Sequence, residues 1–218
     1  MKIPERWTFK SDEVASNFDA HVRETLPWYD LVTGAVALIC RHYIPQGGTV
    51  YDIGASTGNI GNAIAETLIE RSAKIIPVDD SESMADRYLG PQPENILVSD
   101  VCDVEFEEFD VSVFFLTIMF IQPHKRRSLI ENLRSKMRRG GCMIIVDKAE
   151  AGSGYASTVT WRMTLAGKVA SGIPSDQIVA KEMSLGGVQR PIMKDDLPDD
   201  AVEFFRFGDF AGWIIEAK

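Results

Sequence analysis

Apolar residues near the start of the chain recur at a helical spacing. From Val14 to Leu26 every fourth position is apolar, which places these side chains on one face of a helix that begins near Asp12. Pro27 ends this helix, because a proline ring is incompatible with a helix interior. A second helix is expected from about Tyr29 to Tyr43, before Pro45 and a glycine pair.

From position 49 onward, strand-like apolar runs alternate with helical segments. The predicted strands are Thr49–Ile53, Lys74–Val78, Asn95–Val98, Val111–Leu116 and Cys142–Val146. The predicted helices are Asn59–Glu70, a short one through Met84 to Tyr88 capped by Ser81, and Lys125–Arg138, ended by Gly140 and Gly141. Alternation of this kind predicts right-handed crossovers and a parallel sheet.

The last part of the chain departs from this alternation. A helix is expected over Tyr155–Ala170, then an irregular stretch to Asp200, then a β-hairpin of Val202–Phe207 and Trp213–Ala217. The sequence thus predicts one α/β domain with a Rossmann-like, seven-stranded, mostly parallel sheet. We divide it into an N-terminal helical cap (1–45), an α/β core (46–150), a lid or substrate segment (151–200) and a C-terminal hairpin (201–218).

The most informative segment is the run VYDIGASTGNIG from Val50 to Gly61. Gly54 lets the chain turn sharply after a strand, and the small Ala55 and Ser56 allow a ligand to approach the backbone closely. The helix that follows presents free N–H groups. The spacing is G-x-x-x-G-x-x-G, which differs from the G-x-G-x-x-G of dinucleotide-binding proteins.

Acidic residues recur at the ends of the first three predicted strands. Asp52 suits a cationic ligand that carries an amino group, and it would repel a pyrophosphate. Asp79 can accept hydrogen bonds from a ribose diol, and Asp100 with Val101 can meet an adenine amino group. Because ligands of open α/β sheets bind at the carboxyl ends of the strands, the pattern indicates S-adenosylmethionine. The alternative is that these acids merely cap helices.

Charge and composition narrow the function further. The net charge of −9 disfavours a nucleic-acid-binding function, because proteins that bind nucleic acid through its phosphates normally carry a basic surface. The basic cluster between Lys125 and Arg139 is interpreted as a solvated helix face. We expect a cytoplasmic protein without a membrane span, because the N-terminus lacks an apolar signal region and the run 111–121 is too short for a bilayer. Three scattered cysteines indicate reduced thiols, and three histidines without ligand spacing predict no metal site.

Several stretches carry a specific resemblance to a known family. They are Trp7-Thr8-Phe9, Val14-Ala15 with Phe18, Leu26-Pro27-x-Tyr29, Val50 to Ser56 with Gly58, Lys74-Ile75-Ile76-x-Val78-Asp79, Thr117-Ile118-x-Phe120-Ile121-x-Pro123 and Phe205-x-Phe207-Gly208. In these stretches the chain resembles the carboxy-S-adenosylmethionine synthase family, which is built on the class I methyltransferase fold. The antiparallel strand pair at the end of the sheet is typical of the same fold.

The resemblance implies an activity and a set of partners. The family converts S-adenosylmethionine and prephenate to carboxy-S-adenosylmethionine, which a separate enzyme uses to modify a tRNA wobble uridine. It is homodimeric and acts on a small molecule, without direct nucleic-acid contact. The residues expected around the cofactor, from the glycine loop and the resemblance together, are Tyr29, Asp52, Gly54, Ala55, Ser56, Gly58, Asp79, Asp80, Met84, Asp100, Val101 and Phe115.

Two departures from the family keep other activities open. Phe115 stands where the family has an asparagine, and no clear equivalent exists for an arginine that holds the new carboxylate. Arg190, Arg162 and Lys148 are the candidate cations for a substrate carboxylate, with a solvated surface charge as the alternative for each. An ordinary small-molecule methyltransferase and a non-catalytic S-adenosylmethionine-binding protein are therefore alternatives. Nucleic-acid methylation is less favoured, because the fourth strand continues into Leu116-Thr117-Ile118 without an N-P-P-Y or Pro-Cys motif.

Overall fold

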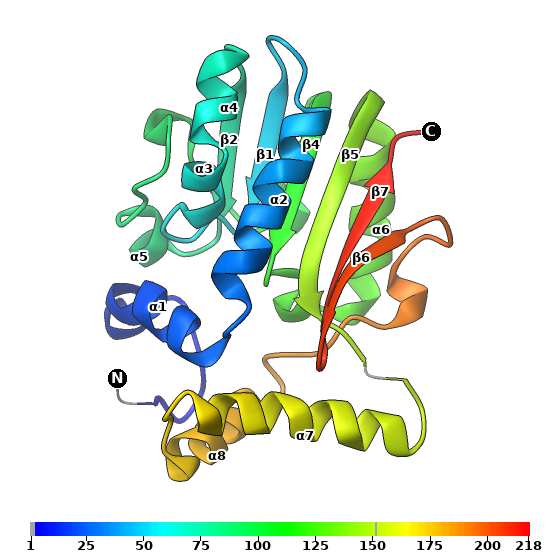
Figure 1. Cartoon of the computed structure of the whole chain (residues 1–218). Helices are drawn as coiled ribbons and strands as arrows, with labels where there is room; N and C mark the ends of the chain where they lie inside the picture. The colour runs from blue at the N-terminus through cyan, green and yellow to red at the C-terminus, as the bar shows by residue number, and fades with distance from the viewer. Residues whose placement is uncertain (1–2, 151) are drawn as a thin grey trace.

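A single mixed sheet forms the centre of the molecule (Figure 1). The structure is a computed structural model that describes residues 3–150 and 152–218. Within these residues the strand order is β3-β2-β1-β4-β5-β7-β6. The strands are β1 Thr49–Ile53, β2 Lys74–Asp79, β3 Leu97–Val98, β4 Phe109–Phe115, β5 Met137–Lys148, β6 Val202–Phe207 and β7 Phe210–Glu216. The first five are parallel, β7 is antiparallel to β5, and β6 is antiparallel to β7, which confirms the predicted fold class.

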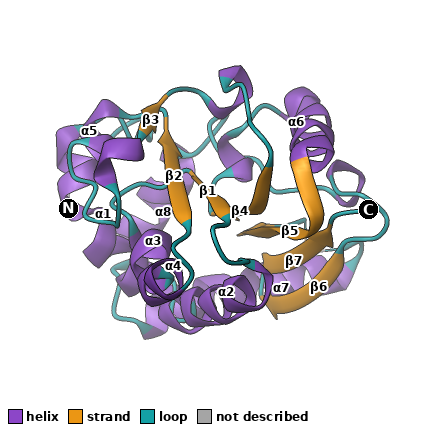
Figure 2. Ribbon diagram, turned by 90° about the horizontal axis from the view of Figure 1, so that it is seen from above, coloured by secondary structure: helices purple, strands orange, loops and turns teal. Residues whose placement is uncertain are grey.

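Helices cover both faces of this sheet. Figure 2 shows α2, α3 and α4 on one face and α6 on the other. The helices are α1 Asp12–Thr25, α2 Tyr29–Tyr43, α3 Asn59–Ala63, α4 Ala65–Glu70, α5 Glu82–Ala85, α6 Pro123–Lys136, α7 Tyr155–Ala170 and α8 Ser175–Ser184, with 3-10 turns η1 Pro93–Asn95, η2 Val101–Asp103, η3 Ile118–Phe120 and η4 Lys194–Asp196. In the described part of the chain, no helix combines the length and apolar character needed to cross a bilayer.

Strand β4 shows how the sequence sets the layers. All seven of its residues are buried, as expected for a central strand with both faces covered. Val111 and Val113 belong to the core beneath α2, whereas Phe114 belongs to the core beneath α6. Because neighbouring side chains point to opposite faces, this division fixes the register of β4 and the position of its carboxyl end.

A helical cover lies across the carboxyl ends of the strands. It consists of residues 3–10, α1, α7 and α8, and Figure 1 shows α7 and α8 beneath the strand ends. Trp7 donates its backbone N–H to the carbonyl of Ser184 at 3.0 Å, and its buried ring shares a small apolar cluster with Val14 and Leu185. The beginning of the chain and α8 therefore form one layer.

The predicted boundaries near two glycines are wrong. Helix α6 ends at Lys136, and Gly140 and Gly141 lie within β5. A Cβ atom at Gly141 would collide with the carbonyl oxygen of Asp110, so glycine serves the close approach of β4 and β5 there. The strand register shifts in this region, between Phe109 and Val111.

Other segments also differ from the predictions. The stretch expected to be irregular contains α8, and the helix expected over 59–70 is divided into α3 and α4 at Ile64. The hairpin turn is confined to Gly208 and Asp209, because Phe210 to Gly212 pair with β5 and β6. Local composition did not reveal these features, because packing against other elements decides them.

The basic cluster on α6 is not uniformly solvated, which corrects the sequence interpretation. The Arg126 side chain is fully buried, and its guanidinium donates hydrogen bonds to the carbonyl oxygens of Ile121, Arg190 and Pro191. It also forms an ion pair with Asp196 at 2.9 Å. Arg126 thus fastens the segment before β6 to the loop after β4.

We expect the Arg126→Met variant to be destabilised by about 3–5 kcal/mol, because it leaves Asp196 buried without its counter-charge. Urea unfolding monitored by circular dichroism would measure this change. The matched control is Arg127→Met, which removes an exposed ion pair with Glu131 and should change stability by less than about 0.5 kcal/mol. Equal stabilities of the two variants would contradict the role of Arg126.

Candidate functional site

A cavity of about 810 Å³ lies between the carboxyl ends of the strands and the helical cover. Its volume is within the range of small-molecule sites, about 300–1,000 Å³. One wall consists of residues that follow β1, β2, β3 and β4, and the other consists of residues from α1, α7 and α8. The sheet order reverses between β1 and β4, so the cavity lies at the topological switch point.

The glycine loop after β1 requires glycine at two positions. Gly54 and Gly58 have φ angles of 74° and 93°, in the left-handed region. A Cβ atom at Gly54 would collide with the Thr117 hydroxyl, and one at Gly58 would collide with the backbone of Gly90. Ser56 also has a positive φ of 51°, and its backbone N–H points to Asp79. The loop is therefore held in one shape.

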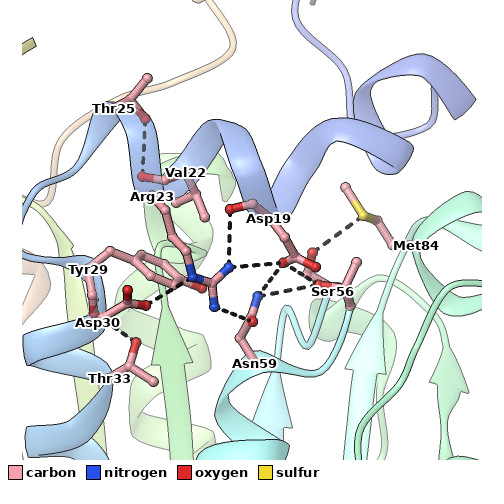
Figure 3. A network of polar contacts seen from close by, with 11 residues as sticks. Asp19, Val22, Arg23, Thr25, Tyr29, Asp30, Thr33, Ser56, Asn59 and Met84 are labelled. Carbon is pink, nitrogen blue, oxygen red and sulfur yellow. Dashed lines mark hydrogen bonds and ion pairs between the residues drawn. The ribbon is translucent and has the colours of Figure 1, made fainter. Parts of the chain in front are cut away.

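Asp79 joins the loops that follow β1 and β2. One carboxylate oxygen accepts the Ser56 N–H at 2.8 Å and the other accepts the Ser81 N–H at 3.0 Å. Burial raises the pKa of Asp79. Ser81 caps α5 by accepting the Met84 N–H, and the Ser56 hydroxyl contacts the Met84 sulfur at 3.3 Å (Figure 3). Asp79 lines the cavity, where its free lone pairs can accept hydroxyl hydrogens.

Asp52 has an unsatisfied oxygen beneath the glycine loop. Its side chain is buried, and Oδ2 has no hydrogen-bond partner. Burial, the largest cause, raises its pKa to about 7. A small second cavity beside the first is lined by Asp52, Tyr29, Gly54 and Ala55, among others. A buried carboxylate with one oxygen free at this position is consistent with the predicted contact to the amino group of S-adenosylmethionine.

The other predicted acids lie at the rim of the main cavity. Asp80 is exposed and pairs with Lys10 at 3.1 Å. Asp100 is also exposed, and it caps η2 by accepting the Cys102 N–H at 2.9 Å, whereas Val101 is buried. Asp80, Asp100 and Val101 all line the cavity. The alternative interpretation of these acids was that they only cap helices. Asp100 does cap η2, and it also lines the cavity.

A polar network from α1 closes over the glycine loop (Figure 3). Asp19 accepts a hydrogen bond from the side chain of Asn59 at 2.6 Å. Arg23 donates to Asn59 at 3.1 Å and to Asp30 at 3.0 Å, and its guanidinium lies over the ring of Tyr29. Sequence reasoning missed this network, because it links three elements that are distant in the chain.

The end of β4 presents an apolar wall to the cavity. Phe115 is buried there against Tyr29, with ring centroids 5.3 Å apart. The next residue, Leu116, has a positive φ of 62°. Thr117 then donates its N–H to the buried carboxylate of Asp147 at 3.0 Å. Asp147 was not predicted as a site residue, and its position at the carboxyl end of β5 was the available signal.

Of the three predicted substrate cations, the structure places one in the cavity. Lys148 lines it, with its ammonium 3.4 Å from Asp209 and 3.2 Å from the side-chain oxygen of Gln189. Arg162 and Arg190 are exposed and do not line the cavity. The backbone of Arg190 instead serves as a partner of Arg126.

Basic residues of the cover were missed by sequence reasoning. Lys168 of α7 and Lys181 of α8 line the cavity, and so does His21 of α1. Because α8 was not predicted from the sequence, nothing in the sequence pointed to Lys181 as a residue of the site. The cavity therefore has acids at the ends of β2 and β3 and lysines at β5 and in the cover. In the described part of the chain no group of three or more His, Cys, Asp and Glu side chains is arranged to hold a metal ion.

Comparisons with known proteins agree with this architecture. The methyltransferase domain family matches residues 51–145, from β1 into β5. The carboxy-S-adenosyl-L-methionine synthase of Staphylococcus epidermidis is 28% identical over 192 residues, which cover 87% of this chain and 84% of that protein. The protein of the same name from Shewanella sediminis is 28% identical over 191 residues, 84% of this chain and 79% of that one.

Solved structures resemble the whole chain at low sequence identity. Magnesium protoporphyrin IX methyltransferase ChlM from Synechocystis PCC 6803, with bound SAH, has a TM-score of 0.58 and 16% identity, covering 94% of both chains. The plantazolicin methyltransferase BpumL, in complex with SAH, has a TM-score of 0.61 and 12% identity, covering 94% of this chain and 90% of that one. These likenesses establish the fold.

The fold is that of the class I S-adenosylmethionine-dependent methyltransferases, and residues 51–145 match the methyltransferase domain family. More particularly, the chain is homologous to the carboxy-S-adenosyl-L-methionine synthases at modest identity. These findings confirm the predicted resemblance and support an S-adenosylmethionine-dependent transferase. The roles of individual cofactor residues stay predictions.

We expect S-adenosylmethionine to bind more weakly as the pH falls from about 7 to 5, because the raised pKa of Asp52 lets it become protonated and lose its attraction for the amino group. Asp79, whose pKa is also raised, acts in the same direction. Asp52→Asn should weaken binding about 10- to 100-fold at pH 7.5 and reduce the pH dependence. Isothermal titration calorimetry would measure both effects.

The Asp52→Asn protein should remain folded. The pKa of Asp52 is raised above its unfolded value, so its charge opposes folding at neutral pH, and removing that charge should not lower the unfolding midpoint. Asp199→Asn, at an exposed position outside the cavity, is the matched control. Wild-type affinity in Asp52→Asn would show that Asp52 does not contact the cofactor.

Proposed function

We propose that this chain forms carboxy-S-adenosylmethionine from S-adenosylmethionine and prephenate. The observation that carries the proposal is the charge division of one cavity. Acids suited to the cofactor lie at the ends of β2 and β3 in this cavity, and Asp52 at the end of β1 lines the small second cavity beside it. Lysines suited to a dicarboxylate lie at β5 and in the cover, where Glu24 and Glu182 also line the wall. The similarity to carboxy-S-adenosyl-L-methionine synthases over 87% and 84% of the chain supports the same reaction.

In this proposal each wall of the cavity has its own task. Asp52 holds the amino group of the cofactor, Asp79 holds the ribose hydroxyls, and Asp100 with Val101 meets the adenine. The apolar side chain of Phe115 keeps water from the reacting methyl group. The methyl carbon of the sulfonium loses a proton and forms a bond to a carboxyl carbon of prephenate, whose bond to the prephenate ring breaks. The ring hydroxyl leaves as hydroxide and takes up the proton as water, and the rest of prephenate becomes phenylpyruvate.

The segment 151–200 is proposed as the substrate lid. Its helices α7 and α8 form part of the cavity wall, and α7 buries only Thr164 among its described side chains. A helix with so little burial can move away from the strand ends at small cost. Lid opening would admit the second substrate, and closure would exclude water.

Ordinary methyl transfer to a small anionic acceptor is the second candidate. Phe115 at the end of β4 favours it, because in-line methyl transfer requires positioning in a dry site rather than a polar catalytic group there. The position of Arg162 and Arg190 outside the cavity also favours it. A non-catalytic S-adenosylmethionine-binding protein is the third candidate, and turnover of any acceptor would exclude it.

We expect the purified protein, incubated with S-adenosylmethionine and prephenate, to produce carboxy-S-adenosylmethionine and phenylpyruvate in equal amounts. Liquid chromatography with mass spectrometry would detect both products. Lys148→Met should raise the KM for prephenate about tenfold or more, through loss of a charged hydrogen-bond donor. Bound S-adenosylmethionine that stays unchanged would overturn this reaction and leave methyl transfer to be tested with a panel of carboxylate acceptors.

The assembly and the cellular role are also proposed. The homodimer and a product that supports tRNA modification come from the resemblance, and the cytoplasmic location comes from the N-terminal sequence and the scattered cysteines. In addition, α7 exposes several large apolar side chains, among them Tyr155, Val159, Trp161 and Met163. Such a surface is typical of an interface between subunits.

We expect the protein to be a dimer by light scattering, and Trp161→Glu to weaken the dimer more than tenfold, because it places a charge in an apolar interface. Leu31→Glu is the matched control, since Leu31 is an exposed apolar residue on α2 rather than α7. A wild-type mass equal to one chain at all concentrations would disprove the dimer.

A further inference from the structure

Lys181 occupies an unusual position in the helical cover. It lies on α8 and lines the cavity, and its ammonium lies over the ring of Trp7. Its Nζ is 3.4 Å from the Nε2 of His21, which lines the cavity from α1. Two basic side chains from two different elements therefore converge on one wall of the cavity.

The other lysines near this wall have carboxylate partners, and Lys181 does not. Lys168 pairs with Glu182 at 2.8 Å, and Lys148 pairs with Asp209 at 3.4 Å. Among the residues that the structure describes, Lys181 forms no ion pair. The Trp7 ring stabilises an ammonium charge only in part. The cluster thus contains one more lysine than carboxylates.

An unpaired ammonium in a partly buried position is unfavourable. Burial is the largest cause that lowers the pKa of Lys181 to about 6, and repulsion from Lys168 adds to it. Burial and Lys181 lower the pKa of His21 to about 4. The groups that face Lys181 are His21 from α1, Lys168 from α7 and its neighbour Glu182, which also interacts with Lys148. An anion entering the cavity would supply the missing counter-charge.

We propose that Lys181, together with His21, binds a carboxylate of the second substrate. This inference takes one element from the proposed function, namely that a small carboxylic acid binds in the cavity beside the cofactor. It does not depend on which reaction follows. The carboxylate of the cofactor is a second possible source of the same chemistry. We assign the site to the substrate because Glu182, the chain neighbour of Lys181 and the ion-pair partner of Lys168, also feels the charge of Lys148 at the end of β5, whereas Asp79 is at the end of β2, and β1 and β4 lie between these two strands.

The site has a consequence that a purely structural lysine would not have. At pH 7.5 the free protein holds Lys181 mostly neutral, because this pH lies above its lowered pKa. A bound carboxylate favours the charged form, so binding takes up close to one proton. Affinity for the carboxylate therefore decreases as the pH rises above about 6. In Lys181→Arg the guanidinium is always protonated, so the carboxylate binds without this proton uptake.

The test measures binding to the full chain saturated with S-adenosylhomocysteine, which has no methyl group to react. Prephenate, benzoate and the uncharged benzamide are the probes, and calorimetry in two buffers of different ionisation enthalpy counts the protons. We expect a carboxylate to bind at least tenfold more tightly than benzamide. Lys181→Met should weaken carboxylate binding about 10- to 100-fold. Lys181→Arg should keep the affinity within about threefold and lose the proton uptake.

The control variant is Lys74→Met, at the exposed start of β2 and outside the cavity, which should bind all probes as the wild type does. Thermal unfolding verifies that each variant folds. If Lys181→Met does not fold, the proton uptake measured with Lys181→Arg tests the inference instead. Unchanged carboxylate affinity in Lys181→Met overturns the inference. So does a loss of S-adenosylhomocysteine affinity with carboxylate affinity retained, which would assign Lys181 to the cofactor.

The same experiment separates this inference from the proposed reaction. Conversion of prephenate by a protein whose carboxylate affinity does not depend on Lys181 would overturn the inference alone. Lys181-dependent binding of benzoate without binding of prephenate would support the inference and overturn the proposed reaction. Absence of binding by either carboxylate to the wild type would overturn the inference.

Discussion

The carboxylate of Asp147, buried at the carboxyl end of β5, organises the loop that follows β4. It accepts the N–H groups of Thr117 at 3.0 Å and Met119 at 3.2 Å. Thr117 in turn donates its hydroxyl to the carbonyl of Ile53 at 2.9 Å and packs against Gly54. One buried acid therefore connects the ends of β5, β4 and β1. Burial raises its pKa to about 7, and backbone hydrogen bonds oppose that shift.

The chemistry of the cavity follows from the parallel sheet. Parallel strands bring their carboxyl ends to one edge, so short polar residues after each strand gather there. Acids gather at the ends of β2 and β3, and most of the basic side chains come from β5 and from the cover, with Lys125 from α6. A cationic sulfonium cofactor and an anionic second substrate would each meet opposite charge. In the proposed reaction, two oppositely charged molecules would then lie side by side without like charges in contact.

Contacts between distant elements explain what sequence reasoning missed. The buried Arg126 resembles its exposed neighbours on α6, and only the carbonyl groups of 121, 190 and 191 distinguish it. Arg23 and Asp19 acquire a role because α1 crosses the glycine loop. Lys181 lies on a helix that the sequence pattern did not reveal. Each of these depends on residues far away in the chain.

The sequence by itself determined the layers, most of the strand–helix alternation and the strand-end positions of the residues predicted to hold the cofactor. Apolar periodicity sets these elements, and the glycine loop with Asp52 and Asp79 is contiguous with the strands that position it. The tertiary structure alone decided the other end. It placed Lys148 in the cavity and Arg162 and Arg190 outside it, and it brought in Lys181. The reason is physical, because strand-end positions follow from local pattern, whereas the cover is placed by packing between segments far apart in the chain.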